Sequence, residues 1–185
     1  MAQIVARDTD SGLLIRDSLD ADLPALQRIY AHHVLHGLAS FEEQPPTLDE
    51  MARRRRELLR DGYPYLVGEA DGQVIGYSYA GRYRPRPAYR HTVESTVYVA
   101  DGQTRRGFGQ ALLGALIERC TAQGFRRMIA VIGDDAHLPS IKLHEALGFR
   151  LAGHLHAVGF KHGRWVDSVL MERALGAGDS TLPDG

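Results

Sequence analysis

The sequence VESTVYVADGQTRRGFGQALLGA, residues 93–115, decides the fold of the chain and the place of its candidate site. Its first part alternates as a β-strand does, with Val93, Ser95, Val97 and Val99 on one face and Glu94, Thr96 and Tyr98 on the other. A polar turn, a glycine-bearing loop and an amphipathic helix follow. Because backbone N–H groups at a glycine-rich helix N-terminus attract anions, the stretch predicts a cradle for phosphate groups.

Three features near this cradle bear on its chemistry. Strands disfavour glutamate, so Glu94 is either a solvent-facing carboxylate or a general base beside the anion. The loop from Arg105 to Gly109 is either a simple tight turn into a helix or, with two arginines at a strand-to-helix junction, a grip for pyrophosphate. Upstream, residues 82–90 interleave four arginines with tyrosines and prolines, a composition suited to holding a small anionic group.

Length and composition limit the class of protein. The chain has 185 residues, a formal net charge of -1 and one cysteine. One domain of this length buries a core without disulfides, and the balanced charge gives no general attraction for nucleic acid or acidic membranes. The first residues form no apolar signal core, and no apolar run reaches the length of a spanning helix. We therefore expect a cytoplasmic protein with no membrane or nucleic-acid partner.

Periodicity and turn signals outside the central stretch predict a mixed α/β fold with helices on both faces of the sheet. Strands are expected at 13–16, 65–70, 73–83, 93–99, 128–132, 151–160 and 165–172, and helices near 22–37, 47–62, 109–124 and 139–148. The resulting order is βααβββαβαββ. One domain is expected over residues 13–175, with flexible tails at 1–12 and 176–185.

Several other polar residues have simpler interpretations than function. His144 shares a helical face with apolar residues, which favours a buried structural histidine. His32 and His36 have helical i,i+4 spacing but no third ligand nearby, so surface histidines are favoured over a metal site. The arginine run 53–56 spreads around a helix and favours a solvated face. Cys120 lies on an apolar stripe and favours the core.

Four motifs together carry a resemblance that none carries alone. They are VESTVYV (93–99), AVIG (130–133), LHEALGF (143–149) and GFKHGRWVDSVLM (159–171). With the order of elements, they resemble the GCN5-related N-acetyltransferases, and within them the phosphinothricin and methionine-sulfoximine acetyltransferase branch, over residues 15–172. The resemblance implies the GNAT acyl-CoA N-acyltransferase fold, direct transfer of acetyl from acetyl-CoA to the α-amine of a small amino-acid-like molecule, no metal, and a homodimer.

The resemblance also implies roles for individual residues. Glu94 matches the family's general base and His144 its active-site histidine. The implied acetyl-CoA contacts are Val97, Tyr98, Val99, Arg105, Arg106, Gly107, Phe108, Gly109, His137 and Ser140, with strands 93–99 and 128–132 splayed around the pantetheine arm. The implied acceptor-pocket residues are Phe41, Arg84, Arg86 and Tyr89.

Two departures and two alternatives accompany this assignment. Thr104 stands where the family often has arginine or glutamine, and His137 where the branch has asparagine, so the contacts to CoA are expected to differ in detail. One alternative is a GNAT enzyme that acetylates another amine, a protein N-terminus or a polyamine; the arginine-rich loop argues against the polyamine. The other is a non-catalytic acyl-CoA-binding module, against which Glu94 and His144 together speak.

Overall fold

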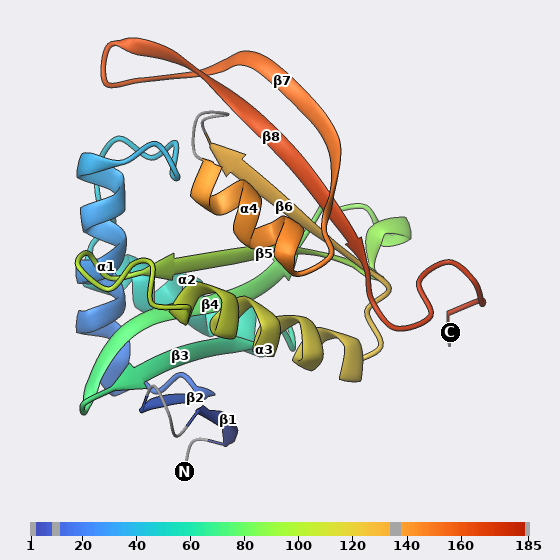
Figure 1. Ribbon diagram of the computed structural model, residues 1–185, viewed down its shortest axis with the longest axis horizontal. Helices are drawn as coiled ribbons and strands as arrows, with labels where there is room; N and C mark the ends of the chain where they lie inside the picture. The colour runs from blue at the N-terminus through green and yellow to red at the C-terminus, as the bar shows by residue number, and fades with distance from the viewer. Residues whose placement is uncertain (1–2, 9–11, 134–137, 184–185) are drawn as a thin grey trace.

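The computed structural model describes residues 3–8, 12–133 and 138–183, in which a mixed sheet lies between two layers of helices (Figure 1). The strands are β1 (Ile4–Asp8), β2 (Leu13–Asp17), β3 (Tyr65–Ala70), β4 (Gln73–Arg82), β5 (Thr92–Val99), β6 (Arg127–Gly133), β7 (Arg150–Lys161) and β8 (Arg164–Ala174). The helices are α1 (Leu23–His36), α2 (Leu48–Arg60), α3 (Phe108–Ala122) and α4 (Leu138–Ala146), with single 3-10 turns at Asp20–Asp22 and Pro87–Tyr89. From β2 onward, this is the predicted order.

The strands are arranged in the sheet in the order β1-β2-β3-β4-β5-β6-β8-β7. Only β5 and β6 pair in parallel among the described strands, and α3 is the crossover that their parallel pairing requires. The remaining pairs are antiparallel. Strand β8 lies between β6 and β7, so the hairpin of β7 and β8 joins the sheet through β8 alone.

The described residues near both ends of the chain make contacts with the domain. Residues Ile4–Asp8 form β1, which pairs with β2 and so covers backbone groups that would otherwise form an open sheet edge. At the other end, Arg126 donates hydrogen bonds to Thr181 Oγ1 at 3.0 Å and to Leu182 O at 2.9 Å. The last described residues therefore fold back against the chain that enters β6.

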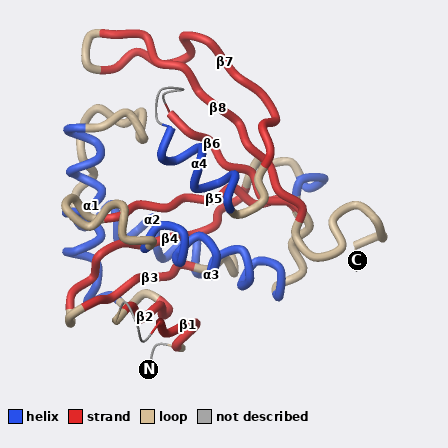
Figure 2. Tube along the Cα trace, viewed as in Figure 1, coloured by secondary structure: helices blue, strands red, loops and turns tan. Residues whose placement is uncertain are grey.

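The helices divide into two pairs, one on each face of the sheet (Figure 2). Helices α1 and α2 cover a cluster that contains Leu26, Ile29, Met51, Tyr65, Val67 and Tyr77. Helix α3 packs on the opposite face through Leu112, Leu113, Leu116 and Cys120, and α4 adds Ile141, Leu143 and Leu147 to the same cluster. Among the described helices, none has the length and apolar character needed to cross a bilayer.

The arginine run on α2 is only partly the solvated face that the sequence predicts. Arg53 and Arg54 do lie at the surface, where they pair with carboxylates such as Glu50. Arg55 is 5% exposed and donates to Ser18 Oγ at 2.7 Å. Consecutive helical residues point about 100° apart, so one of four must turn toward the sheet, and here it finds polar partners at the end of β2.

A partly buried network of ion pairs fixes the start of α1 to the sheet. Arg16 of β2 donates to both carboxylate oxygens of Asp22, at 2.8 and 2.9 Å, and to Glu69 of β3 at 3.0 Å. Burial opposes ionisation of Asp22, yet the hydrogen bonds from Arg16 and from the Leu19 N–H hold the pKa of this carboxyl below its ordinary value. The network sets the direction in which α1 leaves the sheet.

Candidate active site

The site begins where the two parallel strands separate. Strand β5 pairs with β6 from Thr92 to Ser95 and then continues to Val99 alongside β4 only. Strand β6 likewise continues beyond Ala130 to Gly133 alongside β8 only. Figure 1 shows the two strands diverging in this direction. The splay that the family resemblance implies is thus present in the chain.

A cavity of about 200 Å³ occupies this split. Its lining comes from four elements: the α1–α2 loop, β5, β6 and α4. The lining residues are Ala39, Phe41, Glu94, Ser95, Thr96, Val97, Tyr98, Ala130, Val131, Ile132, Gly133, Ser140 and His144. Residues more than a hundred positions apart in the sequence are therefore brought to one concave surface.

Glu94 lies in the cavity with its carboxylate half-buried. Among the described residues, none donates a hydrogen bond to it. Burial raises the pKa of the Glu94 carboxyl above its ordinary value, because the charged form loses water and gains no cation in exchange. An unpaired carboxylate of this kind is available to take a proton from a ligand.

His144 faces the same cavity from α4 and is 4% exposed. Its Nδ1 lies 2.8 Å from the carbonyl oxygen of Ser140, and since a carbonyl only accepts, Nδ1 carries the proton. Burial lowers the pKa of the imidazole, an effect that the Ser140 hydrogen bond partly opposes. The ring is therefore neutral near pH 7, with Nε2 as an acceptor. It is buried, as its helical face predicts, and it also reaches the cavity.

The outer wall of the cavity is the ring of Phe41, which rests on β7. A Cβ at Gly159 would lie 2.4 Å from one carbon of this ring and 2.7 Å from another, so only glycine allows the ring to take this place. The residue is 40% exposed, so contact with β7 is a main constraint on its ring. The position of Phe41 is set by the hairpin.

Lys161, also on β7, fastens the loop that carries Phe41. Its ammonium donates to Gly37 O at 2.9 Å and to Ser40 O at 2.6 Å, and the residue is 2% exposed. Burial lowers the pKa of this ammonium, although nearby glutamates oppose the shift. Sequence reasoning missed this residue, which follows directly after the predicted strand 151–160.

The predicted pyrophosphate loop leads into the first turn of α3. Gly107 is the residue before the helix and has φ +81, a left-handed conformation that favours glycine. Phe108 is 2% exposed, so it is a core side chain and only its backbone N–H faces a ligand at the helix end. The guanidinium of Arg106 lies over its ring and donates to Gln103 Oε1 at 2.6 Å. Arg105 adjoins this turn, and Gly109 lies in it.

The three predicted contacts on β5 lie between the cavity and this helix end. Val97 and Tyr98 line the cavity. The carbonyl oxygen of Val99 accepts a hydrogen bond at 2.8 Å from Nε2 of His33 on α1. The strand thus leads from Glu94 toward the N-terminus of α3, the direction in which an extended ligand with an anionic end fits.

Three predicted acceptor residues lie elsewhere. Arg84 packs over the rings of Tyr83 and Tyr89, at 5.1 and 5.8 Å from their centroids, in the β4–β5 loop. Neither they nor Arg86 belongs to the described residues that line the cavity. Of the two predicted contacts near the start of α4, Ser140 lines the cavity, whereas His137 lies outside the described residues.

The fold and this site define a class of protein. A mixed sheet with a split between its two parallel strands, and a glycine-bearing helix end beside the split, are shared with acyl-CoA-dependent transferases. The family model described as an acetyltransferase (GNAT) domain matches residues 15–170. The chain therefore belongs to the GNAT acetyltransferase family, and the resemblance seen in its motifs is confirmed.

Within this family, several similar proteins are named phosphinothricin or methionine sulfoximine acetyltransferases. The chain is 52% identical over 170 residues to the phosphinothricin N-acetyltransferase of Alcaligenes faecalis, covering 92% of this chain and 86% of the relative. It is 43% identical over 159 residues to the L-methionine sulfoximine/L-methionine sulfone acetyltransferase of Pseudomonas paraeruginosa, covering 85% and 92%. The crystal structure of a phosphinothricin acetyltransferase from Sinorhizobium meliloti in complex with AcCoA matches with a TM-score of 0.91 and 49% identity over 94% of each chain.

Proposed function

We propose that the chain transfers acetyl from acetyl-CoA to the α-amine of a small amino-acid-like acceptor of the phosphinothricin, methionine sulfoximine or methionine sulfone type. One observation carries the proposal: Glu94 presents an unpaired, half-buried carboxylate to a cavity that opens between β5 and β6. The acceptor class rests on the activities for which the relatives are named. A wall formed by Phe41 at the outer end of the cavity suits a small molecule.

The residues present fit acetyl-CoA. The split between β5 and β6 leaves the inner edge of β5 without a strand partner after Ser95, so an extended arm can lie along it. At the far end, Gly107 and the first N–H groups of α3 face the position of an anion, with Arg105 and Arg106 adjacent. Bound there, acetyl-CoA supplies the thioester that is the acetyl donor.

Glu94 acts as the general base. The acceptor arrives as an ammonium, which is not a nucleophile until it loses a proton. The Glu94 carboxylate takes that proton directly or through a water, and its raised pKa makes it a stronger base than an exposed glutamate. The freed amine attacks the thioester carbonyl, which backbone N–H groups of β5 polarise; one well-placed donor contributes about 3 kcal/mol. The carbon–sulfur bond then breaks, and the departing CoA thiolate takes up the second proton from the nitrogen, which leaves the amide and free CoA thiol.

His144 and Cys120 have different roles in this scheme. His144 is neutral, and its Nδ1 proton is held by Ser140, so it orients a water or the acceptor through Nε2. Cys120 is fully buried in the α3 core, and burial raises the pKa of its thiol to about 12. A thiol in that state is no nucleophile, and direct transfer requires no covalent enzyme intermediate.

The test is thiol release from acetyl-CoA by the wild type and by Glu94→Gln, measured over pH 5–9. We expect kcat/KM of the wild type to fall on the acid side as Glu94 becomes protonated, with the midpoint above the ordinary glutamate pKa. In Glu94→Gln, we expect a loss of roughly 100-fold or more, together with loss of this acid limb. The base assignment fails if the variant keeps both the turnover and the acid limb.

A panel of acceptors distinguishes the alternatives. Phosphinothricin, methionine sulfoximine, methionine sulfone, ordinary amino acids, peptides with free N-termini and spermidine are compared at saturating acetyl-CoA. Preference for the amino-acid analogues supports the proposal, and preference for peptides or polyamines replaces the acceptor class. Tight binding of CoA with no turnover on any acceptor supports a non-catalytic module.

We also propose that the protein acts as a homodimer. Strand β7 is a 12-residue strand at the edge of the sheet. It carries exposed apolar side chains, Leu151, Leu155, Val158 and Phe160, and Trp165 of β8 packs edge-on against Phe160. A long apolar edge needs cover, and a second copy of the same hairpin supplies it.

Light scattering after size exclusion tests the dimer. The double change Phe160→Ser and Trp165→Ser is expected to give monomers, whereas Leu35→Ser on the exposed side of α1 is the matched control. A wild type that is monomeric at all concentrations contradicts the proposal.

The lone buried thiol is consistent with the cytoplasm as the working compartment, which we propose as well; detection by cell fractionation tests it.

A further inference from the structure

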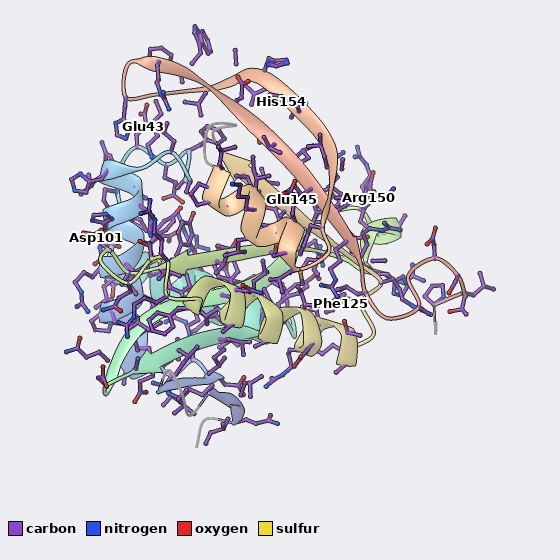
Figure 3. The ribbon with its side chains drawn as sticks, viewed as in Figure 1. Glu43, Asp101, Phe125, Glu145, Arg150 and His154 are labelled. Carbon is purple, nitrogen blue, oxygen red and sulfur yellow. The ribbon has the colours of Figure 1, made fainter. Side chains whose placement is uncertain are left out.

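The β7–β8 hairpin holds a second cluster of reactive side chains, away from the cavity. His154 Nε2 lies 2.8 Å from Asp167 Oδ2, and His156 Nδ1 lies 3.0 Å from the same oxygen. All three donor atoms lie within 4.8 Å of one another, and this is the only such group of three among the described residues. None of the three lines the cavity. Figure 3 shows His154 on the part of β7 that extends beyond the rest of the sheet.

The register of the hairpin brings these residues together. His154 pairs with Val169, so its side chain shares a face of the sheet with that residue and with Asp167, two positions away on β8. The register then shifts between Leu155 and Gly159, which leaves residues 156–158 opposite Asp167. Such bulges redirect side chains, and here the bulge adds His156 to the pair.

The carboxylate of Asp167 is held in a fixed orientation. Its Oδ1 accepts a hydrogen bond at 2.8 Å from the N–H of Ala157, a residue with φ +52 inside the bulge. Its Oδ2 is directed at both imidazoles. Oδ1 therefore binds the backbone, and Oδ2 faces the two histidines. Carboxylates that bind metal ions commonly have a second hydrogen-bond partner of this kind.

We propose that His154, His156 and Asp167 form a binding site for a divalent transition-metal ion such as Zn²⁺. Two imidazoles and one carboxylate match the ligands that Zn²⁺ takes in three-ligand sites, with the fourth position open to water. Ligands at about 2.0 Å from a tetrahedral ion lie roughly 3.3 Å apart, so each imidazole nitrogen needs to move only a few tenths of an ångström away from Asp167 Oδ2. The ion replaces protons shared between imidazole and carboxylate.

The site is built from one chain, and it serves the hairpin rather than acetyl transfer. A bound ion closes the bulge on both strands and stiffens the segment that ends in Gly159 and Lys161. The expectation from the sequence that acetyl transfer needs no metal is unaffected, because the three residues lie apart from Glu94. The proposed metal site does not depend on the proposed acceptor, so a negative result for one leaves the other unaffected.

Calorimetric titration of ZnCl₂ into the full, untagged chain, after treatment with EDTA and dialysis, tests the site. We expect saturable binding of one ion per chain and a higher Tm in its presence. His154→Ala and Asp167→Asn should weaken binding by roughly 10- to 100-fold or more. Asp167→Asn keeps an oxygen that accepts from the Ala157 N–H. A loss of Zn²⁺ binding in this variant therefore reports on the missing ligand and not on a disrupted bulge.

His32→Ala is the matched control, because His32 lies in another group of neighbouring histidines, with its ring centroid 4.9 Å from that of His36 on α1. It should leave Zn²⁺ binding unchanged. Absence of saturable binding in the wild type overturns the proposal. So does binding that survives in both hairpin variants or disappears with His32→Ala, since the ion then binds elsewhere.

Discussion

Lys161→Met tests whether a single buried lysine positions the acceptor wall. The substitution keeps the aliphatic length of the side chain and removes the ammonium that joins β7 to Gly37 and Ser40. A hydrogen bond from a charged group contributes about 1.5–3 kcal/mol. Burying the ammonium costs several kcal/mol in return, so much of this gain is already offset in the wild type.

The net magnitude follows from what replaces the ammonium. In the variant, the desolvation cost disappears, and water reaches the two carbonyl oxygens once the loop moves outward. We expect a loss of about 1–2 kcal/mol in the free energy of unfolding. Because the ring of Phe41 is no longer held over the cavity, acceptor binding should lose a similar amount, and 1.4 kcal/mol corresponds to about a tenfold higher KM.

The assay is steady-state thiol release with each substrate varied at saturation of the other. Acceptor KM should rise about tenfold, while the KM for acetyl-CoA stays within about twofold, because the proposed CoA contacts lie on β5 and α3. Lys142→Met, at the exposed lysine of α4, is the control for loss of a positive charge. Equal effects on both KM values, or no effect on the acceptor, would refute a positioning role for Lys161.

Three further predictions use other parts of the molecule. Gly159→Ala places a methyl group where the Phe41 ring lies, so acceptor KM should rise while Tm stays within a few degrees, measured by kinetics and calorimetry; an unchanged acceptor KM would show that the ring is not a wall. Arg16→Met leaves Asp22 buried and unpaired and should cost about 3–5 kcal/mol in urea unfolding at pH 7. Since the folded pKa of Asp22 lies below its unfolded value near 3.8, its contribution in the wild type is complete above that value and is lost as pH falls through the folded pKa; unfolding at pH 5 and pH 2 measures this. Cys120 should resist a thiol reagent at pH 8 in the folded chain and react fully in denaturant, and rapid labelling of the folded chain would contradict its burial.

The sequence pattern correctly predicts those features of the fold that residues close together in the chain determine. The alternation in 93–99 correctly separates the two faces of β5: Val93 packs in the α3 cluster and Tyr98 in the α1–α2 cluster. Three of the four family motifs, those at 93–99, 130–133 and 143–149, contribute residues to the cavity in the split between β5 and β6. Strand β1 has too short a pattern to be predicted alone, and it exists because β2 offers it an edge.

Contacts between residues that are far apart in the sequence could not be predicted from the sequence pattern. Lys161 binds oxygens 121 and 124 positions away, and no periodicity encodes that contact. The arginine-rich loop has the composition of an anion site, but the guanidinium of its Arg84 stacks on tyrosines of the same loop, and the loop is not part of the described lining of the cavity. Composition indicates what a segment is able to bind, and tertiary packing decides where it lies.

The position of β8 between β6 and β7 has a consequence for synthesis of the chain on the ribosome. Glu94, His144, Phe41 and Lys161 have all been synthesised before the first residue of β8. None of them forms a complete site at that stage, because β7 reaches the sheet only through a strand that is made after it. A nascent chain that ends before residue 164 therefore contains every side chain of the proposed acceptor wall. Without β8, these side chains are not yet held in position. The pocket is therefore completed only when β8, the last of the described strands to be translated, pairs with β6 and β7.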